Sequence, residues 1–310
     1  MESGNGVQAD DPAAGFGLVP LAGGYSGETF LAEVAGDRTV VRIYGPRSAA
    51  RRGAFAAEVD AAVLRLVRGL LPVPEVLEVR RADEPAETPG LLVTTFLPGT
   101  RLDLLLPELG AAERATTGRQ VGEILARLAM MPQLRPGFFV DGELRIEPMP
   151  GGGLIDFVEA YRRGTAISQW PAREYDALVE VAHHAEALLD SLTRTCVVHS
   201  DFNPKNLLVD ASSLEVSGVL DWEFAHAGWP VTDLGNLLRF EREPMFAEAV
   251  LAAYRDGVVD AGDDVLDLAR AADLYALVDL AGRAPENPVT VRASNLLAAI
   301  ASSGDVNAVP

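Results

Sequence analysis

The sequence of 310 residues contains a single cysteine, Cys196. One thiol excludes an internal disulfide, and its place in an apolar run predicts a buried thiol, not a nucleophile. No apolar run reaches the ~20 residues of a membrane span. The start of the chain has no basic stretch followed by an apolar one, as a secretory signal would. We therefore expect a cytoplasmic protein without a membrane partner.

Positive charge is also scarce, since 26 Lys and Arg face 45 Asp and Glu and the net charge is −19. This balance argues against a nucleic-acid partner, because phosphate backbones require a basic face. An acidic surface either serves solubility or attracts a cationic substrate. At this length the chain is expected to form two lobes, and nothing in it specifies an oligomeric state.

The most informative segment lies between residues 197 and 223, VVHSDFNPKNLLVD followed by GVLDWE. Leu207–Val209 and Val216–Leu220 are apolar, and residues 210–213 between them have turn chemistry, so this segment predicts a short β-hairpin. Asn206 enters the first strand and Asp221 leaves the second. Antiparallel pairing therefore brings these two side chains together at one end of the hairpin.

An amide oxygen and a carboxylate side by side are hard ligands, suited to a Mg²⁺ ion that carries phosphates. Asp201 stands five positions before Asn206, in a loop that contains Pro204. It is placed to reach toward the same metal. Phosphoryl transfer needs this set, a carboxylate to orient a hydroxyl and two ligands for the metal. A turn with capping Asp and Asn residues is the alternative interpretation.

These residues resemble the aminoglycoside phosphotransferase family of small-molecule kinases. That family has the loop His-x-Asp-x-x-Pro-x-Asn and a metal motif of a hydrophobic residue followed by Asp-Trp-Glu. The matching residues here are His199, Asp201, Pro204 and Asn206, and then Leu220, Asp221, Trp222 and Glu223. The resemblance implies that Asp201 is the catalytic base and that Asn206 and Asp221 bind Mg²⁺.

Three neighbouring residues receive supporting roles from the same resemblance. His199 is expected to shape the loop without acting as an acid or base, and Asp233 to brace the loop from below. Thr232 or Asp233 is also a candidate N-cap of the helix that begins there. Glu223 is a candidate metal ligand or acceptor contact. Only about a dozen residues separate Asp221 from Asp233 in the sequence. This leaves no room for an activation loop, which favours a small-molecule acceptor.

The first hundred residues contain candidate nucleotide-binding parts. A turn with Gly24, Ser26 and Gly27 lets backbone N–H groups approach phosphate oxygens, although a plain hairpin turn is an alternative. The strand at residues 39–44 carries Arg42 where kinases carry a phosphate-binding Lys. A guanidinium also binds phosphate, with fork geometry.

A helix is expected from about residue 48 to residue 70, with Phe55, Val59, Val63 and Leu66 as its buried stripe. Glu58 lies at the edge of this stripe, and the kinase fold pairs it with Arg42. Strands are expected around residues 76–79 and 91–96. The segment that follows, Leu97-Pro98-Gly99, resembles the hinge between lobes, so the resemblance places Thr95 to Leu97 against the adenine of ATP or GTP.

The predicted fold class is α+β, a bilobal protein-kinase-like fold. Residues 1–15 are expected to be disordered. Residues 16–97 form a nucleotide-binding lobe with a small antiparallel sheet and one helix. Residues 98–310 form a mainly helical lobe that binds the acceptor. The family places part of its acceptor site near residues 155–163, where Asp156 and Glu159 are candidate contacts for a cation.

The sequence leaves three functions open. The first is ATP-dependent phosphorylation of a small cationic antibiotic, an aminoglycoside or a basic cyclic peptide of the capreomycin and viomycin type. The second is a metabolic kinase for choline, homoserine, a sugar or a fructosamine. The third is a catalytically inactive binding module, which would have no need of a base together with two metal ligands. The acceptor itself has no portable motif.

Overall fold

The computed structural model describes residues 18–21, 28–34, 36–45, 52–83 and 87–309. The chain divides into two compact units. The first consists of residues 1–68, 73–98 and 140–144, and the second of residues 69–72, 99–139 and 145–310. Antiparallel sheets occur in both units, and most helices belong to the second. The predicted α+β class is therefore confirmed.

The first unit is built on an antiparallel sheet with strand order β1-β2-β3-β5-β4. The hairpin between β2 and β3 closes so that Val34 pairs with Asp37. Gly36 in its turn has a φ of +91°, a conformation that glycine adopts without strain. Alternate residues of β5 are buried, as expected for a sheet with one covered face. The strands are β1 Val19–Pro20, β2 Glu28–Val34, β3 Asp37–Tyr44, β4 Val76–Arg80 and β5 Gly90–Thr95.

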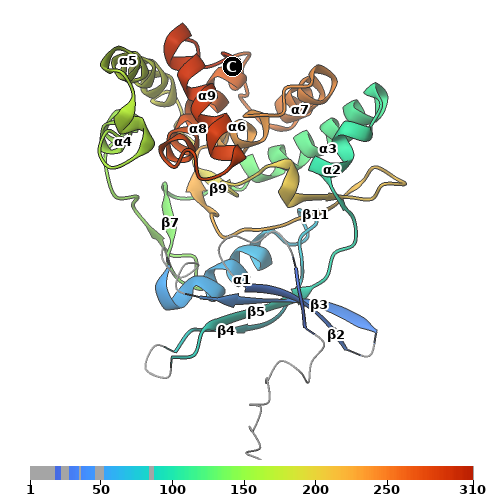
Figure 1. Cartoon of the computed structure of the whole chain (residues 1–310). Coiled ribbons are helices and arrows are strands. Elements are labelled where there is room, and N and C mark those ends of the chain that lie inside the picture. Colours follow the sequence, from blue (N-terminus) through green and yellow to red (C-terminus); the bar gives the residue numbers. More distant parts are fainter. Residues whose placement is uncertain (1–17, 22–27, 35, 46–51, 84–86, 310) are drawn as a thin grey trace, which may run out of the picture. The chain divides into compact units, whose positions relative to one another are not determined.

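The helix of this unit, α1 (Ala56–Val67), packs on β4 and β5 and follows a 3-10 turn, Gly53–Phe55 (Figure 1). Val59 and Val63 are fully buried, as predicted. Leu64 and Val67 are also buried, whereas Leu66 is 40% exposed. The predicted stripe was wrong at Leu66 because the buried face of the last turn runs through Leu64 and Val67, which lie three residues apart and leave Leu66 outside that face. The helix is also shorter than predicted at its C-terminal end.

In the second unit, two helices approach each other through small residues. Gly118 and Gly122 lie one turn apart on α3 (Ala111–Ala129) and face α7 (Pro244–Gly257). A Cβ atom at Gly122 would lie 2.4 Å from the carbonyl oxygen of Val250. The absence of side chains at these positions therefore allows the two backbones to touch, which gives extensive van der Waals contact. The helices lie side by side in Figure 1.

A second close contact joins α6 (Thr232–Leu238) to α8 (Val265–Gly282). A Cβ atom at Gly235 would lie 2.1 Å from the carbonyl oxygen of Ala269. Every residue of α6 after Thr232 is buried. This short helix is therefore held inside the helical layer.

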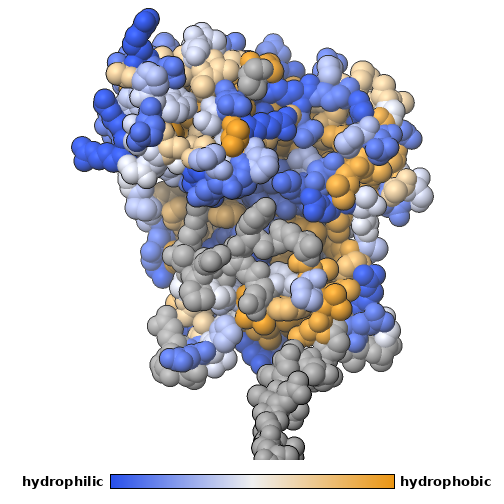
Figure 2. All heavy atoms as spheres, viewed as in Figure 1, coloured by the Kyte–Doolittle hydropathy of each residue, from blue (hydrophilic) through white to orange (hydrophobic). Residues whose placement is uncertain are grey.

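The second unit also contains two small antiparallel sheets, with strand orders β11-β10-β6 and β8-β7-β12-β9. On the face drawn in Figure 2, the surface of the helices is mainly hydrophilic, which agrees with the acidic composition. Among the described residues, no helix combines the length and apolarity that a bilayer crossing requires. The other elements are β6 Thr100–Arg101, α2 Leu102–Leu105, β7 Gly137–Phe139, β8 Ile146–Glu147, α4 Leu154–Tyr161, α5 Ala172–Leu189, β9 Cys196–Val198, β10 Leu207–Val209, β11 Val216–Val219, β12 His226–Gly228 and α9 Pro288–Ser303, with 3-10 turns Leu106–Glu108, Ala166–Gln169 and Pro204–Asn206.

The contact between α6 and α8 predicts a stability effect. Gly235→Ala forces a methyl group against the Ala269 carbonyl, so we expect a loss of about 1–3 kcal/mol in the free energy of unfolding. Urea denaturation measures it. Gly110→Ala is the matched control, because a Cβ atom there meets only a Glu113 oxygen at 3.4 Å. Equal stability of the two variants would contradict the close contact.

Candidate active site

The loop with the proposed base begins where β9 ends. His199, the first residue after this buried strand, is itself fully buried. Its Nε2 donates to the carbonyl oxygen of Leu220 at 2.8 Å, and its Nδ1 accepts from the backbone N–H of Asp201 at 3.2 Å. Burial lowers the pKa of His199, so the ring is neutral and both nitrogens are engaged with the main chain. The geometry gives His199 no free nitrogen for proton transfer.

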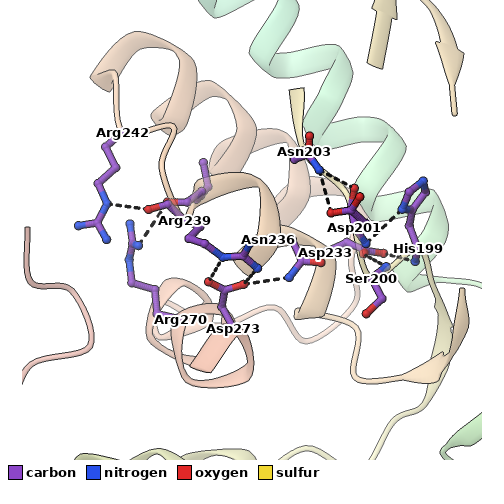
Figure 3. A network of polar contacts seen from close by, with 11 residues as sticks. His199, Ser200, Asp201, Asn203, Asp233, Asn236, Arg239, Arg242, Arg270 and Asp273 are labelled. Atoms are coloured by element: carbon purple, nitrogen blue, oxygen red, sulfur yellow. Dashed lines mark hydrogen bonds and ion pairs between the residues drawn. The ribbon is translucent and has the colours of Figure 1, made fainter. Parts of the chain in front are cut away.

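Asp233 holds the same loop from α6. Its carboxylate oxygens accept from the backbone N–H groups of His199 at 2.8 Å and Ser200 at 2.7 Å (Figure 3). Ser200 has a φ of +65°, a strained conformation for a non-glycine residue that such hydrogen bonds maintain. The predicted N-cap was wrong. Val231 is the N-cap of α6 and has no polar side-chain atom with which to cap it. The carboxylate of Asp233 is bonded to the loop instead.

The other end of α6 is anchored by a buried polar network (Figure 3). Asp273 on α8 accepts from Asn236 Nδ2 at 2.9 Å, and from Arg239 Nε at 2.8 Å and Nη2 at 2.5 Å. The guanidinium of Arg239 also interacts electrostatically with Asp201. Sequence reasoning missed all three residues. A signal was available in Asn236, a polar residue among the apolar residues at the end of α6, and in Arg239, which directly follows the helix.

Asp201 is fixed by two asparagines of its own loop. Asn203 Nδ2 donates to one carboxylate oxygen and Asn206 Nδ2 to the other, each at 2.9 Å. Both amides also donate to the Asp201 carbonyl oxygen. Asn203, which the sequence analysis did not single out, in addition caps the 3-10 turn that starts at Pro204. Each carboxylate oxygen keeps further lone-pair capacity, so Asp201 is oriented and still able to accept a hydrogen bond.

The predicted hairpin is confirmed as β10 paired antiparallel with β11. The N–H of Leu220 donates to the carbonyl oxygen of Asn206 at 2.8 Å, so Asn206 and Asp221 stand at the same end. Asp221 has a φ of +64°. Burial and the nearby charge of Asp221 raise the pKa of Asp201 to about 6. The structure therefore brings Asp201, Asn206 and Asp221 together.

This arrangement suits one cation. Because Asn206 uses its Nδ2 for Asp201, its Oδ1 points elsewhere and accepts no hydrogen bond from the described residues. An unused amide oxygen near a carboxylate fits Mg²⁺, which binds through few protein oxygens and retains water or phosphate oxygens for its other positions. Within the described part of the chain, no cluster of three or more His, Cys, Asp or Glu residues forms a fuller metal site.

The candidate phosphate-binding residues belong to the first unit. Gly24, Ser26 and Gly27 lie outside the described residues. Arg42 is half-buried on β3, with its guanidinium carbon 5.3 Å from the centre of the Tyr44 ring.

The predicted ion pair between Glu58 and Arg42 is not formed. Both carboxylate oxygens of Glu58 accept from Arg81, at 2.7 and 3.1 Å. Glu58 lies at the open edge of α1, within reach of the residue that follows β4. The buried carboxylate of α1 is Asp60, which accepts from the hydroxyl of Tyr44 at 2.6 Å and from Arg52. Its sequence signal was a lone charge between alanines and valines.

The predicted adenine contacts follow β5. The N–H of Thr95 donates to the Glu75 carbonyl oxygen at 2.9 Å, and that of Phe96 to the Arg38 carbonyl oxygen at 3.3 Å. These amides are therefore used inside the sheet. Leu97 N–H has no such partner among the described residues, and of the predicted segment it alone is available to a ligand.

The candidate acceptor residues lie in the second unit, and their surroundings differ. Asp156 and Glu159 are exposed on α4. Asp156 interacts electrostatically with Tyr275 on α8, whereas Glu159 interacts with Tyr175 on α5. Glu223 is half-buried beside Asp221 and the buried Trp222.

Comparison with known proteins identifies the family. Residues 17–273 match the model of the phosphotransferase enzyme family. The chain belongs to this family. The phosphotransferase also has the kinase-like fold of solved aminoglycoside phosphotransferases, which confirms the predicted fold.

Two solved structures illustrate the similarity. A ternary complex of a thermostable mutant of aminoglycoside phosphotransferase APH(4)-Ia with AMP-PNP and hygromycin B has a TM-score of 0.66 and 20% identity, covering 93% of this chain and 95% of that one. The GDP complex of an aminoglycoside 2′-phosphotransferase-IIIa mutant has a TM-score of 0.66 and 16% identity, covering 93% and 91%. Identities this low show the common fold alone.

Among curated proteins, the phosphotransferase is similar to mouse acyl-CoA dehydrogenase family member 10, with 26% identity over 245 residues. The match covers 77% of this chain and 22% of the mouse protein. The chain thus spans about a fifth of the length of this relative.

The contact between Asp233 and the loop predicts a stability effect. Asp233→Asn turns an amide donor toward one of the two backbone donors, which leaves a buried N–H without an acceptor. We expect the free energy of unfolding to fall by about 2 kcal/mol or more, as measured by urea denaturation. Asp176→Asn, at an exposed position of α5, should change it by less than about 0.5 kcal/mol. A similar small change in both variants would show that Asp233 does not brace the loop.

Proposed function

We propose that the chain transfers the γ-phosphoryl group of ATP, with Mg²⁺, to a hydroxyl of a small cationic molecule. The observation that carries this proposal is the loop in which Asn206 orients Asp201 through Nδ2 and leaves its Oδ1 unused, at the end of the hairpin that also carries Asp221. The solved relative with AMP-PNP and hygromycin B supports both the nucleotide and the type of acceptor. GTP is the alternative donor, since another relative holds GDP.

In this proposal Asp201 receives the hydrogen bond of the acceptor hydroxyl and takes its proton as the oxygen bonds to the γ-phosphorus and the bond from that phosphorus to ADP breaks. The two asparagine amides keep the carboxylate in one orientation, so little reorganisation is needed during the reaction. Partial burial strengthens the hydrogen bond that Asp201 accepts, because water competes less for the carboxylate.

Asn206 and Asp221 would hold the metal through one amide oxygen and one carboxylate oxygen. A bound Mg²⁺ supplies positive charge to the phosphate oxygens during transfer. The proposed phosphate and adenine contacts of the first unit are Arg42, the N–H of Leu97, and Gly24, Ser26 and Gly27. Glu58 is not among them, because its carboxylate is occupied by Arg81.

The proposed acceptor is a cationic antibiotic, an aminoglycoside or a basic cyclic peptide. The net charge of −19 supports a cation, since an acidic surface concentrates it and speeds its capture. Asp156 and Glu159 are exposed and therefore available to it. A metabolic amino alcohol or sugar acceptor remains the alternative.

The proposal predicts the behaviour of Asp201→Asn. This change preserves shape and removes the proton acceptor, so turnover should fall by roughly 100-fold or more. ATP affinity should change little. The assay is phosphate mass gain on a panel of aminoglycosides, basic cyclic peptides, amino alcohols and sugars, followed by kinetics on the best acceptor. Near-normal turnover of the variant would refute the role of Asp201. If no aminoglycoside or basic cyclic peptide gains a phosphate, the antibiotic assignment is wrong.

The metal assignment gives a second prediction. Asp221→Ala removes the carboxylate ligand, so the increase in ATP affinity that Mg²⁺ causes should be lost, as measured by calorimetry with and without the metal. Asp210→Ala is the matched control. It removes a carboxylate from the turn at the opposite end of the same hairpin and should preserve the Mg²⁺ effect. An equal loss in both variants would mean that the hairpin, and not the ligand, is responsible.

A further inference from the structure

The second unit contains a row of four aromatic rings that the proposed mechanism does not use. Trp229, which follows β12, lies 5.9 Å from Tyr275 on α8, measured between ring centres. Tyr275 lies 5.1 Å from Phe157 on α4, and Phe157 lies 4.8 Å from Tyr161. All four side chains are half-buried. Part of this aromatic row therefore remains in contact with solvent.

The aromatic row is fixed at its Tyr161 end. The hydroxyl of Tyr161 donates to Asp279 Oδ1 at 2.6 Å, and Arg283 donates to Asp279 Oδ2 at 2.7 Å. Gly282 allows the Tyr161 ring to lie against α8, since a Cβ atom there would be 2.6 Å from it. A preorganised surface of this kind loses little freedom when a ligand binds.

The charged groups around Tyr275 are all negative. Glu186 and Asp156 act electrostatically on its hydroxyl and, together with burial, raise the pKa of Tyr275 to about 12. Glu186 is held in place because its Oε1 accepts from the N–H of Leu154 at 2.9 Å. Among the described residues, the hydroxyl of Tyr275 has no hydrogen-bond partner. The middle of the aromatic row is thus neutral at physiological pH and lies in a negative potential.

The aromatic row is near the proposed reaction centre. Arg239 interacts electrostatically with Asp201 and also with Asp279, which holds Tyr161. Trp229 directly follows β12, the strand that pairs with β9, and β9 leads into the loop of Asp201. Both features connect the aromatic row to the loop of Asp201 within the second unit.

We propose that Tyr275, Phe157 and Trp229 bind an alkyl-substituted ammonium group of the acceptor, with Asp156 and Glu186 as the nearby opposite charges. The inference rests on the proposed function and adds the chemical class of the group recognised. The faces of aromatic rings attract cations, and this attraction is strongest for groups that leave water easily. An alkylated ammonium is positively charged and leaves water easily. A primary ammonium needs hydrogen-bond acceptors that the rings do not supply.

Tetramethylammonium chloride is a suitable probe, with sodium chloride as the ionic-strength control. Saturation-transfer NMR and tryptophan fluorescence should show saturable binding to the full chain, tighter than that of ammonium chloride. Tyr275→Leu should weaken binding about 3- to 30-fold, the range of one cation–aromatic contact. Tyr275→Phe keeps the ring and should bind within about twofold of the natural chain. Asp156→Asn tests the charge separately if the leucine variant fails to fold, and it should also weaken binding.

Phe240→Leu is the matched control. Phe240 is also half-buried. The guanidinium carbons of Arg292 and Arg239 lie 4.4 and 5.9 Å from the centre of its ring, so the ring offers no site for another cation. Its loss should leave binding unchanged. No saturable binding, or equal affinity of Tyr275→Leu and Phe240→Leu, would overturn the inference. Because the probe has no hydroxyl, the result does not depend on phosphoryl transfer, and a failure of the proposed function would be seen separately in the acceptor assay.

Discussion

The carboxylate of Asp233 holds the candidate active site together. It accepts two backbone N–H groups at the point where β9 turns into the loop, and the loop's geometry follows from that contact. Ser200 adopts its left-handed conformation there, His199 then reaches the end of β11, and Asp201 is carried to the asparagines. Separating the carboxylate from the loop would leave two buried N–H groups and the carboxylate itself without partners, which is costly, so one side chain can maintain a strained turn.

That carboxylate is useful only if α6 itself is immobile. Two features of α6 provide this. Gly235 allows its backbone to touch α8, and Asn236 and Arg239 are bound to Asp273 on α8. A buried ion pair of this kind gives uncertain net stability but penalises any arrangement that separates its members. Positions 233, 236 and 239 thus link the loop of Asp201 to the packing of α6 on α8.

The sequence predicted the parts of the site that depend on local spacing. The hairpin followed from two apolar segments around a turn, and the proximity of Asn206 and Asp221 followed from antiparallel pairing. The family and fold followed from the ordered motif between His199 and Asp233. By contrast, Asp273 is 40 residues from Asp233 in the sequence, and only the packing of α6 on α8 identifies it as a partner of Arg239. Nothing local distinguishes it from any other helical aspartate.

The error at Glu58 has a similar origin. Periodicity placed Glu58 correctly at the edge of the buried face of α1, but the choice of its cation depended on where β4 ends and Arg81 begins. The buried carboxylate is Asp60. Burial distinguishes Asp60 from Glu58 better than position in a motif does. A carboxylate enclosed by the protein must have partners, whereas a carboxylate at the edge of a helix can pair with whichever cation is near.

The backbone at Asp221 indicates what this part of the chain requires. With a φ of +64°, the position suits glycine, which would adopt the conformation at lower energetic cost. Glycine has no carboxylate, however. Aspartate in this conformation costs local stability and places a negative charge at the end of the hairpin, beside the loop of Asp201. The preference of the backbone and the charge at this end of the hairpin are therefore opposed at a single residue.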